Sequence, residues 1–206
     1  MSEQLSTGVD ALDRTLRGGV PAGSVVAVTA KPASRADRLL YELASARRTL
    51  YLTATRSAAA VRDALARDGV DADRCAVHDL DAERPLDHAY QLVQQTTEPA
   101  TVVIDPANAL ERANEGRLAD FLNALRGHLT ETGGVAVLHC LDGRSVPPQR
   151  DVTEYVADGV LSVATERRDG ELETRLAVPK FRGKPPATES IELAFDRGGR
   201  VEGPVS

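Results

Sequence analysis

The sequence is poor in cysteine and in long apolar runs. Among 206 residues only Cys75 and Cys140 are cysteine, and they are far apart without C-x-x-C spacing, so neither a disulfide framework nor a cysteine-based zinc site is supported. No apolar run approaches the roughly 20 residues that span a bilayer, and the polar N-terminus has no signal-peptide core. We therefore expect a cytoplasmic protein with no membrane contact and with two free, buried thiols.

Aromatic residues are also scarce, at 3% of the chain, and tryptophan is absent. Grooves that bind single-stranded nucleic acid combine basic charge with aromatic side chains on which the bases stack. The formal net charge is −6, whereas nucleic-acid binders usually present a basic face. The composition therefore gives only weak support to DNA binding.

Lysine is rare as well, because only Lys31, Lys180 and Lys184 contribute to the 25 basic residues. Arginine in place of lysine, with abundant aspartate and alanine, resembles the proteomes of halophilic archaea and of high-GC bacteria. The chain is 42% hydrophobic, which is enough for one core at this length. We predict a single domain over residues 1–206.

The chain is organised around a stretch that has the frame of a phosphate-binding loop. The apolar run Val25 to Thr29 predicts a buried strand, and Arg35 to Arg47 predicts an amphipathic helix. The loop and the first residues of the helix are Ala30, Lys31, Pro32, Ala33, Ser34, Arg35, Ala36 and Asp37. A working loop has the pattern G-x-x-x-x-G-K-[ST], in which glycine amides and lysine hold phosphates and the hydroxyl binds magnesium. The four positions that this pattern specifies are Ala30, Arg35, Ala36 and Asp37, so the frame is predicted to have lost its chemistry.

The segment before this loop, Leu5 to Ser24, has the form L-S-T-G-x-x-x-L-D-x-x-L-x-G-G-x-P-x-G-S. Near the other end stands the pattern D-G-V…K-F-R-G…I-E-L-A-F. Together they resemble the RecA-like ATPases of the KaiC and RadA type, over nearly the whole chain. The resemblance implies a RecA-like three-layer α/β/α fold, with a mainly parallel central sheet that is finished by C-terminal antiparallel strands.

In the KaiC-like pattern, the strand that corresponds to Leu50–Thr53 is followed by a pair of glutamates, one of which activates the attacking water. This sequence has Ala54, Thr55 and Arg56 at that place. None of the three side chains can accept a proton from water at neutral pH. Hydrolysis by the route of the family is therefore not expected.

Two strand ends keep residues that the resemblance connects with nucleotide. Asp105 ends the apolar run Thr101–Asp105, where an aspartate can hold magnesium through water; the alternative is a turn residue before Pro106. His139 lies at the carboxyl end of the next apolar run, Val135–Cys140, where related ATPases place a residue that senses the γ-phosphate. The alternative for His139 is a packed histidine at a strand end.

Lys180 and Arg182 belong to the K-F-R-G element. In hexameric relatives this lysine and arginine reach the nucleotide of the neighbouring subunit, so the resemblance implies possible action in trans on an active paralogue. The alternative is that both residues keep a strand edge soluble.

The remaining patterns predict connecting elements. One long helix is expected from Asn108 to Thr132, because its leucines form one apolar stripe. Leu141–Asp151 is expected to be a solvated loop that carries Arg144 and Arg150, and Gly198–Gly199 predicts a last turn.

These observations favour a degenerate RecA-like protein without ATPase activity, which needs no cofactor and acts by binding a protein, such as a paralogous KaiC-like ATPase or a second copy of itself. A first alternative is an enzyme that binds ATP and Mg²⁺ through a remodelled loop, with Lys31 reaching the phosphates. A second alternative is a DNA-associated accessory factor of the recombinase type.

Overall fold

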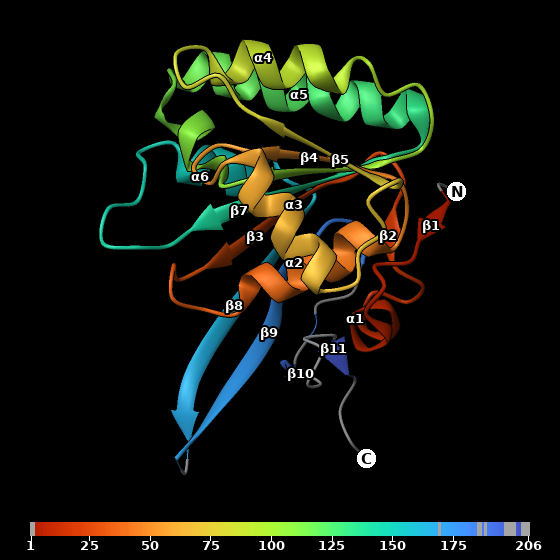
Figure 1. The fold of residues 1–206 in the computed structure, drawn as a ribbon, viewed down its shortest axis with the longest axis vertical. Coiled ribbons are helices and arrows are strands. Elements are labelled where there is room, and N and C mark those ends of the chain that lie inside the picture. The colour runs from red at the N-terminus through yellow and green to blue at the C-terminus, as the bar shows by residue number, and fades with distance from the viewer. Residues whose placement is uncertain (1–2, 169, 185–186, 188, 196–200, 203–206) are drawn as a thin grey trace.

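A nine-stranded sheet between two layers of helices forms the body of the computed structural model, which describes residues 3–168, 170–184, 187, 189–195 and 201–202 (Figure 1). The strand order is β11-β10-β9-β8-β3-β7-β6-β4-β5, and β1 and β2 form a separate small sheet. The strands are β1 (Gln4–Leu5), β2 (Val20–Pro21), β3 (Val25–Ala30), β4 (Thr49–Thr53), β5 (Cys75–Asp79), β6 (Thr101–Asp105), β7 (Val135–Leu141), β8 (Gly159–Arg168), β9 (Glu171–Phe181), β10 (Ile191–Phe195) and β11 (Val201–Glu202). The helices are α1 (Asp10–Thr15), α2 (Ala36–Ser45), α3 (Ala58–Arg67), α4 (Pro85–Val93), the 3₁₀ helix η1 (Ala107–Arg112), α5 (Glu115–Thr132) and α6 (Arg150–Val156).

The two faces of the sheet carry separate apolar clusters. Leu12 of α1, Leu39 of α2 and Val61 of α3 belong to the cluster on one face. Ala89 of α4 and Leu125 of α5 belong to the cluster on the other face. The central strands are therefore apolar on both sides, which explains why they appear in the sequence as unbroken apolar runs.

Strands β3 to β8 run parallel, and β9, β10 and β11 continue the sheet in antiparallel fashion. Parallel strands end at a common edge, and ligands of open α/β sheets bind at that edge. The register sets Thr53 opposite Asp105 and Val28 opposite His139. Residues that are far apart in the sequence are thereby brought together next to the loop after β3.

The N-terminal pattern of small and polar residues forms a structural turn. Asp13 accepts hydrogen bonds from the Ser6 hydroxyl at 2.6 Å and from the backbone N–H of Thr7 at 2.8 Å. Gly19 has φ +106°, and a Cβ atom on it would lie 2.2 Å from the carbonyl oxygen of Leu5. The spacing of this motif therefore follows from the close approach of two chain segments.

The prediction of one long helix from Asn108 to Thr132 is wrong. The 3₁₀ helix η1 ends at Arg112, Ala113 is extended, and the side chain of Asn114 caps a new helix by accepting a hydrogen bond from the N–H of Gly116 at 2.9 Å. Asparagine caps helices well because its oxygen satisfies a free N–H group of the first turn.

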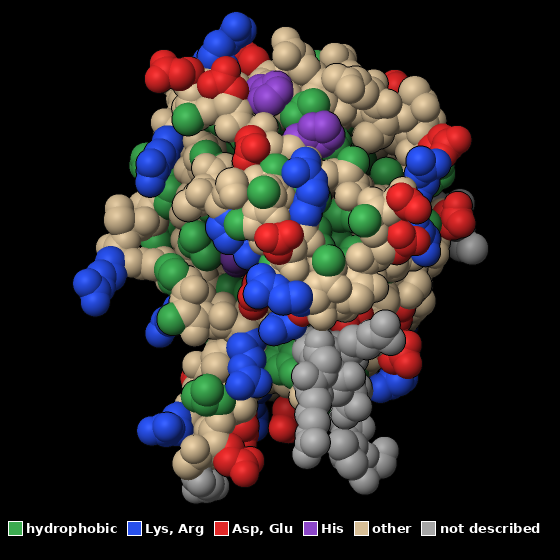
Figure 2. Space-filling view, viewed as in Figure 1, with side chains coloured by type: hydrophobic (Ala, Val, Ile, Leu, Met, Phe, Trp, Pro, Cys, Tyr) green, Lys and Arg blue, Asp and Glu red, His purple; other side chains and the backbone are tan. Residues whose placement is uncertain are grey.

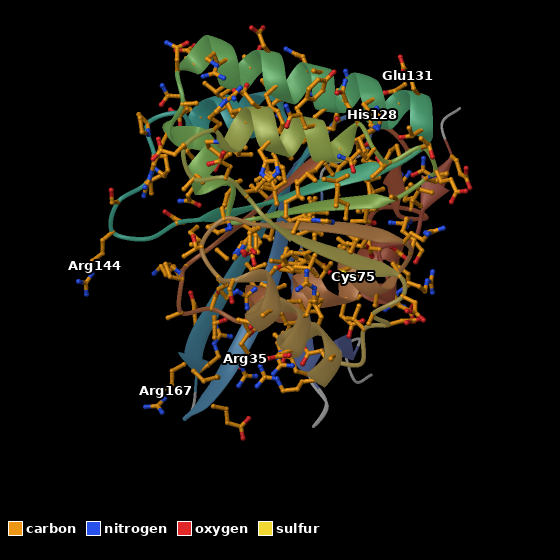
Figure 3. The ribbon with its side chains drawn as sticks, turned by 45° about the horizontal axis from the view of Figure 1, so that its top comes forward. Arg35, Cys75, His128, Glu131, Arg144 and Arg167 are labelled. Carbon is orange, nitrogen blue, oxygen red and sulfur yellow. The ribbon has the colours of Figure 1, made fainter. Side chains whose placement is uncertain are left out.

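The expected solvated loop after β7 is also partly wrong. The observed loop ends before Arg150, because Arg150 is the first residue of α6. Arg150 is also only 6% exposed, so it is not solvated. Its guanidinium donates to both carboxylate oxygens of the fully buried Glu111, at 2.8 and 2.9 Å. Arg144 does extend away from the body (Figure 3).

Two further expectations meet different outcomes. Both cysteines are free and buried, as predicted. The turn expected at Gly198–Gly199 lies outside the described residues.

Within the described ranges, no helix combines the length and the apolar character that crossing a membrane requires.

Candidate functional site

The loop after β3 has the length of a phosphate-binding loop. Strand β3 ends at Ala30 and α2 begins at Ala36, as the sequence pattern requires. Ala36 is only 1% exposed, so a small apolar side chain packs where a phosphate-binding loop has its lysine. Lys31, in contrast, is exposed at the start of the loop, and Asp37 follows in the first helical turn.

Backbone N–H groups of this loop are already hydrogen-bonded within the chain. The N–H of Ser34 donates to the carbonyl of Lys31 at 2.9 Å, and the N–H of Ala36 donates to the Ser34 hydroxyl at 3.3 Å. The N–H of Arg35 donates to the hydroxyl of Thr165 on β8, at 3.4 Å. In a working phosphate-binding loop such amides hold the phosphate oxygens. Here the acceptors of these three N–H groups are oxygens of the protein itself.

Asp105 is the centre of a group of polar side chains, which we call the Asp105 cluster: Tyr41, Tyr51, Arg56, Asp105 and His139. All are buried except Arg56, which is half-buried. One carboxylate oxygen accepts from the Tyr51 hydroxyl at 2.6 Å and from the Arg56 guanidinium at 2.8 Å. The other oxygen lies 2.7 Å from Nδ1 of His139. Because a carboxylate only accepts hydrogen bonds, Nδ1 must carry the proton. Arg56 also donates to the Tyr41 hydroxyl at 2.8 Å.

The electrostatics of the cluster favour the charged forms of Asp105 and Arg56. Burial raises the pKa of the Asp105 carboxyl, but the hydrogen bond from His139, with those from Tyr51 and Arg56, lowers it to about 2. Burial raises the pKa of Tyr51, and the charge of Asp105 raises it further, so Tyr51 stays a neutral donor. Burial lowers the pKa of Arg56, but hydrogen bonds to Tyr41 and Asp105 outweigh this and raise it overall.

The Asp105 cluster does not fit magnesium in this arrangement. Both carboxylate oxygens of Asp105 accept hydrogen bonds from the chain, and a guanidinium cation lies 2.8 Å from one of them. A second cation at the same carboxylate would meet repulsion from the Arg56 charge. Nε2 of His139 is buried without a hydrogen-bond partner among the described residues.

Lys180 and Arg182 lie at the opposite end of the sheet from the loop. Lys180 is opposite Val160 at the start of β8, next to the amino ends of the parallel strands. Its ammonium donates to the carbonyls of Glu154 and Tyr155, at 2.7 and 2.8 Å, and Arg182 also donates to the Tyr155 carbonyl, at 2.6 Å. Both side chains thus bind the end of α6 within the chain, and their action on a neighbouring subunit stays a prediction.

The sequence alone did not suggest Tyr41, Tyr51 or Arg56 as members of a group around Asp105. Tyr51 and Arg56 reach Asp105 through the pairing of β4 with β6, which unites segments about 50 residues apart. Tyr41, on α2, joins the group through its hydrogen bond with Arg56. One local signal was available, because Tyr51 is a polar-tipped residue inside a buried apolar strand, and a buried tyrosine hydroxyl usually has a partner.

The strand order, the helices on both faces and the loop at the carboxyl end of β3 define a RecA-like α/β/α fold. The crystal structure of a KaiC-like protein from the archaeon Pyrococcus horikoshii superimposes with a TM-score of 0.77, covering 98% of this chain and 100% of that one at 18% sequence identity. The fold class implied by the sequence resemblance is thereby confirmed.

Residues 4–203 match the family of unknown function DUF7125, and the chain belongs to that family. It is 35% identical over 109 residues to the DNA repair protein RadA of Mycolicibacterium smegmatis, which covers 50% of this chain and 22% of that protein. It is 26% identical over 155 residues to RadA of Mycobacterium tuberculosis, which covers 63% of this chain and 32% of that protein. The chain thus spans less than a third of the length of these curated relatives.

Proposed function

We propose that this RecA-like protein has no ATPase activity and acts by binding another protein, such as a paralogous KaiC-like ATPase or a second copy of itself. The observation that carries the proposal is that groups of the chain itself bind the loop amides and Asp105, a state that we call the self-occupied site. Loop amides bind Ser34 and Thr165, and Asp105 is paired with Arg56. ATPases of this kind leave the loop amides for phosphates and the strand-end aspartate for magnesium. A nucleotide would have to displace several internal hydrogen bonds before it gained its own.

The absence of a carboxylate after β4 supports the same proposal. Arg56 follows that strand and donates to Asp105, so the place where a general base would stand carries a positive charge instead. A guanidinium stays protonated in proteins and cannot take a proton from water.

Thermal unfolding with and without 5 mM ATP, ADP and Mg²⁺ tests the proposal. We expect no shift in the midpoint beyond that caused by sodium chloride at the same ionic strength, a control for non-specific ionic effects. A ligand present at 100 times its Kd stabilises a one-site protein by about 2.7 kcal/mol, which such a scan detects readily. A saturable stabilisation by nucleotide alone would favour the remodelled loop with Lys31 as its phosphate-binding cation.

A DNA-associated role is the second candidate, and the similarity to two proteins named as DNA repair proteins favours it. Figure 2 adds Lys and Arg side chains gathered over α2 and the β8–β9 hairpin. Titration of a labelled 30-mer single strand at 20 and 200 mM salt tests this candidate, because phosphate contacts make affinity fall steeply with salt. Lack of binding at 20 mM salt removes it.

A further inference from the structure

Tyr155 is unusually exposed for a large side chain. Among the described residues, only Val146, Tyr155 and Leu172 are exposed large hydrophobics, and Tyr155 is the most exposed of them at 78%. It stands near the end of α6, at the amino edge of the sheet. Tyrosine is enriched among the residues that dominate the binding energy of protein interfaces.

Two cations bind the backbone carbonyl of Tyr155, and one of them also lies near its ring. Lys180 and Arg182 both donate to its backbone carbonyl, at 2.8 and 2.6 Å. The Lys180 ammonium also lies 5.9 Å from the centroid of the Tyr155 ring, within the range of a cation–π contact. A side chain that is already ordered loses less conformational entropy when a partner binds it.

The surroundings of Tyr155 are positively charged. Arg182 and Arg126 are 46% and 53% exposed in their side chains, and both approach the buried Asp158, at 3.9 and 3.3 Å. Lys180 is the third cation, and the two carboxylates that act on it are the buried Asp158 and the half-buried Glu154. The cations are therefore in excess here, on a chain whose net charge is −6. We call Tyr155, Arg126, Lys180 and Arg182 the Tyr155 patch.

We propose that the Tyr155 patch is the docking site for an acidic segment of a partner protein, in which an apolar side chain packs on the Tyr155 ring and flanking carboxylates pair with the three cations. Charge complementarity favours an acidic partner, because opposite charges steer and orient association. The inference rests on the proposed function as a protein-binding protein, and it gives Lys180 and Arg182 a use that needs no nucleotide.

Selection from a display library of random 12-residue peptides on the immobilised full-length protein tests the proposal, followed by titration of labelled synthetic copies. We expect the recovered peptides to be enriched in Asp and Glu around a large apolar residue. Their affinity should fall at least tenfold in Tyr155→Ala and less than twofold in Leu172→Ala, which removes a matched exposed hydrophobic at another site. Raising the salt from 50 to 300 mM should also weaken binding.

Other outcomes would overturn the proposal. The selection could recover no peptides, or peptides without acidic enrichment, or peptides that bind wild type and Tyr155→Ala equally. Sedimentation could also show a dimer that Tyr155→Ala abolishes, which would make a second copy of the chain the occupant. Nucleotide binding in the thermal assay would refute the internally bonded loop as a barrier to nucleotide and leave this docking site standing. Failed peptide selection with no nucleotide binding would refute the docking site alone.

Discussion

At the scale of single residues, Arg56 is the cation that neutralises the Asp105 carboxylate. Their 2.8 Å contact joins a side chain that is 39% exposed to one that is 8% exposed. A partly exposed pair is screened by water, so its energy is smaller than that of a fully buried one. The same contact closes the Asp105 cluster to an external cation.

Substitution Arg56→Ala should lower the free energy of unfolding by about 1 to 2 kcal/mol, because Asp105 loses a charge-assisted hydrogen bond while it stays buried. Urea denaturation measures this change. Arg74→Ala, which removes an exposed arginine elsewhere, is the matched control and should change stability by less than about 0.5 kcal/mol. Equal effects of the two substitutions would contradict the described role of Arg56.

The lowered pKa of Asp105 predicts a dependence of stability on pH. The pKa falls from the ordinary value of 3.8 to about 2 in the folded protein, so the folded state favours the charged carboxylate. The resulting stabilisation is complete above about pH 4 and disappears as the pH falls towards 2, with a total of about 2 kcal/mol. Urea denaturation between pH 5 and pH 3 should therefore show a steeper loss for wild type than for Asp105→Asn. Parallel curves would exclude the shift.

At the scale of elements, local sequence predicted the buried strands well and the connections less well. The run Thr101–Asp105 is strand β6 with the predicted bounds, because a strand buried on both faces is apolar throughout. The break at Asn114 was missed, since the leucine stripe concealed the cap. Helix α6 was missed because its first residue, Arg150, is buried only through its pairing with Glu111, a contact between distant segments.

The same limit applies to the candidate site. The loop frame follows from local strand and helix patterns, and the lost glycines and lysine are visible in the sequence. The internal replacements are not visible, because Thr165 reaches the loop through the pairing of β3 with β8 and Arg56 reaches Asp105 through the pairing of β4 with β6. Only the assembled sheet brings these groups together.

Two glycine-to-alanine substitutions should change the free energy of unfolding in opposite directions. Gly19→Ala should destabilise the protein by at least about 2 kcal/mol, because its φ is positive and the new Cβ would meet the Leu5 carbonyl. Gly127→Ala, inside α5 with nothing within 4 Å of the new Cβ, should stabilise it by about 0.5 to 1 kcal/mol. Thermal unfolding of both variants measures the pair, and a stable Gly19→Ala would refute the tight N-terminal turn.

At the scale of the whole molecule, the two ends of the parallel sheet differ in use. The carboxyl edge, where ligands of this architecture normally bind, carries the self-occupied loop and the Asp105 cluster. The amino edge carries Tyr155, held by Lys180 and Arg182. Under the proposed function, the carboxyl edge has no nucleotide chemistry and the amino edge is where a partner protein binds.

The amides of Ser34, Arg35 and Ala36 are hydrogen-bonded within the chain, and we propose that they do not receive phosphate. The most direct measurement is an NMR titration of ¹⁵N-labelled protein with Mg²⁺–ATP, which follows the backbone amides of Ser34, Arg35 and Ala36. We predict that these three signals keep their positions up to 5 mM nucleotide, apart from small shifts that sodium chloride at the same ionic strength also causes. Saturable shifts at these amides with ATP alone would contradict the account.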